Sequence, residues 1–235
     1  MKVHVLGCHG PYPCAGGATS GYLVEHEGKA LLMDCGAGIL GRLMLKWDPA
    51  ALECVLLSHL HFDHASDMLV LRYYMERMGK TLDVYVPGED ESPLRQLLTA
   101  PAFNVRSYPE TLHVMGLTIT TLPVSHPVPC RALRLTDGQK TLVFTGDTSA
   151  PGGLAEFARD ADVLLSDSAF LSTEWTETMP HMSARMCGEL AAQAGVKRLC
   201  LTHLAPRHAP EAVTADARAV FLAAETVTPG QVIDL

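Results

Sequence analysis

Residues 58–64 read Ser58-His59-Leu60-His61-Phe62-Asp63-His64 and directly follow the apolar run Val55-Leu56-Leu57. The apolar run predicts a buried strand, which delivers the polar cluster to the rim of a sheet. Alternation along an extended chain places the first two histidines on one side. The turn that follows can carry the aspartate and the third histidine toward a second point about 3.5–4 Å away, a typical spacing between two metal ions. Imidazole nitrogens and carboxylate oxygens are ligands of zinc and similar divalent ions, so the stretch predicts a metal site rather than a chance histidine-rich loop.

Other potential ligands also follow strand-like apolar runs, at the ends of strands where loop residues of open α/β sheets converge. They are Asp34 after residues 30–33, His126 after 117–122, Asp147 after 141–145 and His203 after 198–201. Asp34 taken alone is more typical of a turn or a helix cap. Three further histidines, His4, His26 and His113, lie within a strand or beside hairpins, and we expect them to be structural or surface residues.

The order of the elements predicts an α/β fold. Residues 1–110 and 111–235 each begin with paired strands and continue with alternating helices and strands, and the last helix and strand are expected at 211–224 and 232–233. This pattern predicts two sheets packed face to face with helices outside, a four-layer αββα sandwich. No polar linker or low-complexity run interrupts the chain, so residues 1–235 are expected to form a single domain.

The composition of the 235-residue chain is that of an ordinary globular protein, with 48% hydrophobic and 19% charged residues. Its 26 acidic and 18 basic residues give a net charge of −8, which disfavours nucleic acid as a partner. The seven cysteines are scattered without a Cys-x-x-Cys pair, which favours free thiols in a reducing compartment. The sequence shows neither a signal-peptide core nor the roughly 18 consecutive apolar residues of a membrane span, so we expect a cytoplasmic protein without membrane contact.

Taken in order, the candidate residues resemble the signature of metallo-β-lactamase-fold hydrolases. The set is Asp34, His59, His61, Asp63, His64, His126, Asp147 and His203. The flanking segments are similar to the ribonuclease Z branch in particular, namely Thr145-Gly146-Asp147-Thr148, His181-x-Ser183-Ala184 and Leu201-Thr202-His203-Leu204-x-x-Arg207. The resemblance covers roughly residues 1–208.

The resemblance implies a role for each position. His59, His61 and His126 would hold one metal ion, Asp63, His64 and His203 would hold a second, and Asp147 would bridge them with a shared water or hydroxide. Asp34 would orient the histidine loop from behind. His181 would donate a proton to the leaving oxygen, oriented by Asp167 where the branch usually has a glutamate, so that Asp63, His181 and Asp167 are the candidate catalytic residues.

The chain also differs from typical members of the ribonuclease Z branch. Phe62 replaces a small residue and is expected at the mouth of the site, as a candidate substrate contact. The long Gly/Pro-containing arm with which tRNA-processing members grip tRNA has no counterpart, because the segment between His126 and Asp147 holds one tight hairpin. The chain therefore resembles the small bacterial phosphodiesterases and uncharacterised hydrolases of the branch, and because members are often homodimers, a homodimer is a further expectation.

Two divalent ions can supply hydroxide near neutral pH and stabilise charge on a phosphodiester, with zinc as the first choice and Mn²⁺ or Fe²⁺ as alternatives. Arg207 is a candidate donor to a phosphate oxygen, Thr19 and Ser20 are weaker candidates for substrate contacts, and His208 is not expected to coordinate. A small-molecule phosphodiesterase, of cyclic nucleotide or cyclic ribose phosphate type, is the favoured function. The alternatives are a lactonase, thioesterase or arylsulfatase, a disfavoured tRNA 3′-end endonuclease, and a metal-binding module without catalysis.

Overall fold

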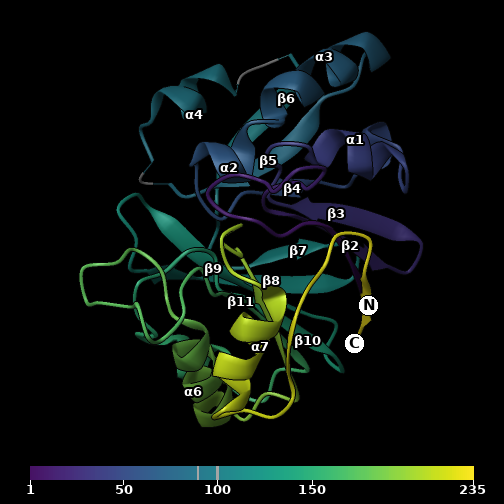
Figure 1. Ribbon diagram of the computed structural model, residues 1–235. Helices are drawn as coiled ribbons and strands as arrows, with labels where there is room; N and C mark the ends of the chain where they lie inside the picture. Colours follow the sequence, from purple (N-terminus) through teal and green to yellow (C-terminus); the bar gives the residue numbers. More distant parts are fainter. Residues whose placement is uncertain (89, 99–100) are drawn as a thin grey trace.

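The computed structural model describes residues 1–88, 90–98 and 101–235. Within these ranges the strands form two seven-stranded sheets (Figure 1). Three of the strands that end in predicted ligands, Val55–Leu56, Thr141–Phe144 and Arg198–Thr202, are short and buried along nearly all of their length, as expected where helices cover one side of a sheet and a second sheet covers the other.

The first sheet contains β1 (Lys2–Gly7), β2 (Gly21–His26), β3 (Lys29–Met33), β4 (Val55–Leu56), β5 (Leu82–Val86), β6 (Phe103–Ser107) and β14 (Val232–Asp234). Their order in the sheet is β14-β1-β2-β3-β4-β5-β6. The pairs from β14 to β3 are antiparallel and the pairs from β3 to β6 are parallel. Pairing of β14 with β1 brings the two ends of the chain together (Figure 1).

The second sheet contains β7 (Leu112–Val114), β8 (Leu117–Val124), β9 (Cys130–Thr136), β10 (Thr141–Phe144), β11 (Val163–Asp167), β12 (Arg198–Thr202) and β13 (Ala224–Thr226). Their order is β13-β12-β11-β10-β9-β8-β7. The pairs from β7 to β10 are antiparallel and those from β10 to β13 are parallel. Both sheets are thus mixed, with hairpins at one side and parallel strands at the other.

Helices cover the outer faces of the sheets. They are α1 (Ile39–Met44), α2 (Phe62–Ala65), α3 (Met68–Met78), α4 (Pro93–Leu97), α5 (Leu154–Phe157), α6 (Ala184–Ala194) and α7 (Pro210–Arg218), with a 3-10 turn at Pro49–Ala51. In Figure 1, α1, α3 and α4 lie beyond the first sheet and α6 and α7 beyond the second. Side chains from both sheets, among them Tyr22 and Phe144, share one buried apolar cluster. The predicted αββα arrangement is confirmed.

Several boundaries differ from the prediction. The last helix ends at Arg218 instead of running to residue 224, and the chain then enters the edge strand β13. The alanine-rich sequence favours a helix, but pairing with β12 overrides this local preference. Strand β6 is also absent from the sequence prediction, because only its first residue is fully buried and it lacks a long apolar run. Finally, β14 joins the first sheet, so the two halves of the chain do not map cleanly onto the two sheets.

Among the described residues, we find no helix with the length and apolar character needed to cross a lipid bilayer.

Candidate metal centre

The predicted ligands from both sheets converge at one place. Residues 58–64 follow β4 in the first sheet, whereas the other ligands follow β8, β10 and β12 in the second. The donor atoms form three groups in which all ligand atoms lie within 4.8 Å of one another. The first group is His59, His61, His126 and Asp147, and the second group is Asp63, His64, Asp147 and His203. The third shares Asp147 and His203 with the second group and adds Asp167 and His181, which were not predicted as metal ligands. The structure therefore brings together all seven residues that the sequence singled out as metal ligands.

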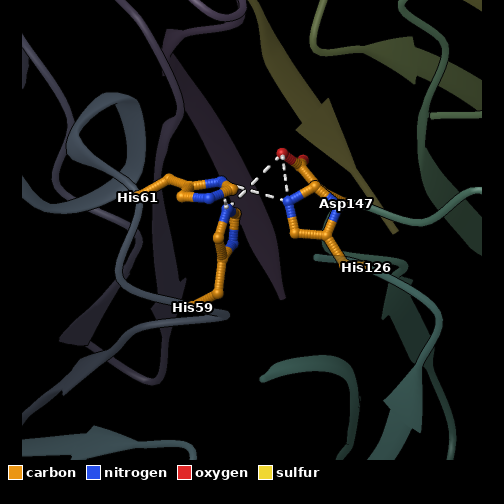
Figure 2. A group of neighbouring side chains, drawn as sticks. All are labelled: His59, His61, His126 and Asp147. Carbon is orange, nitrogen blue, oxygen red and sulfur yellow. Dashed lines mark hydrogen bonds and ion pairs between the residues drawn. The ribbon is translucent and has the colours of Figure 1, made fainter. Parts of the chain in front are cut away.

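Three imidazoles of the first group point their nitrogens at a common point (Figure 2). His61 Nδ1 lies 3.1 Å from both His59 Nε2 and His126 Nε2. Asp147 Oδ2 lies 3.5 Å from His59 Nε2 and 3.9 Å from His126 Nε2. Two nitrogens bound tetrahedrally to zinc at about 2.0–2.1 Å would be roughly 3.3 Å apart, so the spacing of these donors fits such an ion.

The second group consists of two histidines and two carboxylates. His64 Nε2 lies 3.2 Å from Asp147 Oδ2 and 3.6 Å from Asp63 Oδ2. His203 lies 3.3 Å from Asp147 Oδ1 through Nδ1 and 3.8 Å from Asp63 Oδ2 through Nε2. Both nitrogens of His203 are buried and make no hydrogen bond to any described residue. Because an unsatisfied buried polar atom is costly, these nitrogens fit a site that holds a cation.

The protonation of the histidines also suits metal binding. Burial lowers the pKa of His59 well below its usual value, and lowers that of His126 and His203 to about 4. These imidazoles are therefore neutral near pH 7 and keep the lone pair that a metal ligand needs. Burial acts in the same direction on His64, but the Asp147 and Asp34 carboxylates outweigh it and raise its pKa well above the usual value. A cation bound by the second group would therefore take the place of the proton on His64 Nε2, next to the same carboxylates.

Asp34 holds the histidine loop from behind. It is fully buried, and its Oδ2 accepts a hydrogen bond of 2.7 Å from His64 Nδ1. The backbone N–H and the hydroxyl of Ser58 also donate to Asp34, at 2.8 and 2.9 Å. Since Ser58 Oγ donates to Asp34, it can accept from His59 Nδ1 at 3.1 Å. In both histidines Nδ1 then carries the proton, which leaves Nε2 for a metal ion.

His126 has an equivalent partner that the sequence analysis missed. Its Nδ1 lies 3.3 Å from the backbone carbonyl of Pro180, the residue before His181. A backbone acceptor 54 positions away leaves no recognisable signal in the sequence. Ser58 was also missed as a partner, although its place directly before His59 was a signal that could have been used.

The backbone at Gly10 lies so close to His203 that no side chain fits there. A Cβ atom added to Gly10 would lie 2.0 Å from His203 Nε2, a distance that would force the imidazole to move. The loop after β1 therefore packs its backbone against the ligand that follows β12, and only glycine fits at this position.

His181 and Asp167 lie beside the second group. His181 Nδ1 donates a hydrogen bond of 2.9 Å to Asp167 Oδ2, which also accepts one of 3.0 Å from the backbone N–H of Thr148. The His181 ring stacks on that of His203, with 4.7 Å between centroids. Burial disfavours the charged imidazole, but Asp167 outweighs this effect and raises the pKa of His181 to about 9. A protonated imidazole held in this way can donate a proton from Nε2.

The remaining candidates differ in exposure and in hydrogen-bond partners. The Phe62 side chain is 73% exposed at the start of α2. Arg207 donates to Glu174 Oε1 at 2.9 Å, and His208 Nε2 lies 2.7 Å from the same oxygen, so His208 has a carboxylate partner away from the metal ligands. Thr19 and Ser20 are each only 1% exposed, so their contact with a substrate stays a prediction, and their burial disfavours it.

Residues 29–204 match the family model of the beta-lactamase superfamily domain. The chain belongs to the beta-lactamase superfamily. It is 34% identical over 229 residues to "Probable metallo-hydrolase YhfI" of Bacillus subtilis (strain 168), with 94% of each chain covered. The crystal structure of this metallo-beta-lactamase fold protein superimposes with a TM-score of 0.94 at 33% identity, over 99% of this chain and 98% of YhfI.

More distant members are ribonucleases. Ribonuclease Z of Methanosarcina acetivorans is 23% identical over 285 residues, covering 94% of this chain and 93% of the relative. The short form of human tRNase Z shares the fold, with a TM-score of 0.80 at 19% identity over 100% of this chain and 99% of that enzyme. The expected place in the metallo-β-lactamase fold, on its ribonuclease Z-like branch, is confirmed.

Proposed function

We propose that this protein is a dinuclear metal-dependent hydrolase that cleaves a small phosphodiester. The observation that carries the proposal is that Asp147 belongs to both donor groups, with Oδ2 facing the first group and both oxygens facing the second. A carboxylate shared in this way is suited to bridging two divalent ions. The first ion would be held by His59, His61 and His126, and the second by Asp63, His64 and His203.

Such ions lower the pKa of water and stabilise negative charge on the group that is attacked. The nitrogen-rich first group favours zinc, although manganese and iron bind similar donors. The residues of the chain then orient and protonate the substrate. His181 Nε2 would give its proton to the leaving oxygen while the Asp167 carboxylate keeps the imidazolium in place, the usual role of a histidine paired with an acid. Phosphodiesters would gain most from this arrangement, because their developing negative charge spreads over oxygens that two ions can reach, and their leaving alkoxide needs a proton.

Features of the chain disfavour a large nucleic-acid substrate. The net charge is −8, and the hairpin between His126 and Asp147 is short. The relatives named ribonuclease Z support phosphodiester chemistry, but the acidic composition favours a small molecule. We therefore propose a small phosphodiester of cyclic nucleotide or cyclic ribose phosphate type, acted on in the cytoplasm.

The test is hydrolysis of bis(p-nitrophenyl) phosphate by protein of measured metal content. We expect turnover that a chelator abolishes, and that Asp147→Ala lacks because the carboxylate common to both donor groups is gone. The same preparation is assayed with lactones, thioesters and sulfate esters. Brisk cleavage of one of these classes without cleavage of the phosphodiester would assign the protein to another hydrolase activity instead.

A further inference from the structure

One side of His181 is lined by residues that the metal centre does not use. Three rings lie near its imidazole: His203 at 4.7 Å, His126 at 5.4 Å and Phe170 at 6.0 Å between centroids. Two of these rings are candidate metal ligands, so Phe170 forms the apolar side. A leaving group that takes its proton from His181 would lie beside this imidazole, where Phe170 is the neighbouring ring that is not a candidate ligand.

Phe170 is held rigidly relative to His181. It follows β11 and forms a β-bridge with Ser183, two residues after His181, and its carbonyl accepts a hydrogen bond of 2.9 Å from Ala184 N. The indole of Trp175 donates to the carbonyl of His181 at 2.8 Å. The loop between β11 and α6 therefore fixes the aromatic ring and the proton donor as one unit.

A guanidinium group covers the Phe170 ring. Arg207 Cζ lies 5.4 Å from the ring centroid, and Arg207 Nη2 donates to Glu174 Oε1 at 2.9 Å. Glu174 belongs to the same loop as Phe170, and it also contacts His208. The Arg207 side chain nevertheless remains 53% exposed. Arg207 is thus held over Phe170 while its side chain stays partly exposed to solvent. We call Phe170, Arg207 and Glu174 the leaving-group platform.

We propose that the leaving-group platform binds the part of the substrate that departs on the His181 side, and that it takes a flat heteroaromatic ring, so that the substrate is a nucleoside phosphodiester. This inference rests on the proposed phosphodiesterase function and names its substrate class. Guanidinium planes and aromatic rings both stack on nucleobases, and the guanidinium adds donors for ring nitrogens and carbonyls. A purely alkyl leaving group would use neither property.

Binding of a free nucleoside tests the platform directly. The chain has two tryptophans, and Trp47→Phe leaves Trp175, which lies in the same loop as Phe170, as the only tryptophan reporter. We expect the metal-loaded Trp47→Phe protein to bind adenosine saturably in equilibrium dialysis, with a change in Trp175 fluorescence, and ribose to produce neither effect. Because one base–side chain stack is lost, Phe170→Leu and Arg207→Ala should each weaken adenosine binding about tenfold.

The matched control is Arg185→Ala. Arg185 is also exposed and paired with a glutamate, Glu189, but it lies on the solvent side of α6, so its loss should leave adenosine affinity unchanged. Equal affinity in wild type and Arg207→Ala, or an equal loss in Arg185→Ala, would overturn the platform. Arg207→Ala carries the test alone if Phe170→Leu does not fold.

Different results would overturn the proposed phosphodiesterase function and the leaving-group platform. Cleavage of bis(p-nitrophenyl) phosphate without adenosine binding would overturn the platform and leave the phosphodiesterase function standing. Platform-dependent adenosine binding without cleavage of any phosphodiester would overturn the proposed function, and with it the substrate class, and would leave the platform standing as a nucleoside-binding site.

Discussion

Asp34 contacts both halves of the candidate metal centre. It bonds His64 of the second group directly, and it reaches His59 of the first group through the Ser58 hydroxyl. One buried carboxylate therefore sets the tautomer of a ligand in each group. The connection from Asp34 to His59 depends on the single hydroxyl group of Ser58. Loss of this hydroxyl should therefore weaken the binding of one metal ion more than that of the other.

Ser58→Ala should weaken the metal ion bound by His59, His61 and His126 by about 10–100-fold, the usual effect of removing a hydrogen-bond partner of a ligand. The second ion should bind almost normally, because Asp34 still holds His64. Competition with a chromogenic chelator measures both affinities. Ser20→Ala is the control, since Ser20 Oγ also contacts Asp34, at 3.3 Å, and no histidine. An equal effect in Ser20→Ala would show that Ser58 has no specific role, whereas Ser58→Thr should restore binding.

His181→Ala should retain both metal ions and lose about 10²–10⁴-fold in turnover on substrates with poor leaving groups, because their alkoxide then departs without a proton. The loss should be much smaller for a p-nitrophenyl leaving group, which departs as a stable anion. Metal analysis and steady-state rates on both substrate types provide the measurement. Equal rates of wild type and mutant on alkyl esters would remove His181 from the mechanism.

At the level of elements, three neighbouring strands of the second sheet carry the site at one end and are tied together at the other. β10, β11 and β12 end near Asp147, Asp167 and His203. At their amino ends Asp162 accepts hydrogen bonds from Thr141 N at 2.8 Å and from Lys197 Nζ at 2.8 Å, with Lys140 Nζ at 3.3 Å. This one carboxylate therefore helps to keep the strands in register, and with them the ligands.

Asp162→Asn should lower the free energy of unfolding at neutral pH by about 1 kcal/mol, a modest value because both lysines reach solvent. Burial of the carboxyl raises its pKa, but Lys197, Thr141 and Lys140 outweigh this and leave the pKa below its usual value of 3.8. Because the pKa of Asp162 is lower in the folded than in the unfolded protein, its carboxylate stabilises the fold at pH values above the unfolded-state pKa. This stabilisation is lost as the pH falls through the folded-state pKa. Urea unfolding should therefore show a difference between wild type and mutant that shrinks as the pH falls below 3.8. A difference that persists there would contradict the assignment.

For the molecule as a whole, the metal centre joins the two sheets. Residues 59–64 follow a strand of the first sheet and His126, Asp147 and His203 follow strands of the second, so the candidate ligands meet across the sandwich. Figure 2 shows this for His59, His61, His126 and Asp147. Without a cation, this region holds buried carboxylates and imidazoles at close range. Metal ions that bind only the folded chain stabilise it by mass action.

Removal of metal should therefore lower the unfolding temperature. With free metal at a thousandfold excess over the dissociation constant, binding contributes about 4 kcal/mol per site, and a chelator removes this contribution. Differential scanning calorimetry with and without chelator measures the change, and added zinc should reverse it. The Asp147→Ala variant, which lacks the shared carboxylate, should respond much less to the chelator. An unchanged unfolding temperature in the wild type would show that the site does not bind metal.

The sequence alone determined the chemistry of the site and the architecture around it. The ligand types are visible as residue identities, and their position after apolar runs predicts that they meet at strand ends, as they do for His59, His126, Asp147 and His203. Local pattern was least informative for short edge strands such as β6 and β13, where pairing with a neighbour decides the conformation. Only the tertiary structure revealed the partners of the functional side chains. Pro180 behind His126, and Phe170 and Glu174 around Arg207, lie 54, 37 and 33 positions from the residues they contact, and contacts of that range depend on how the strands of the second sheet are arranged.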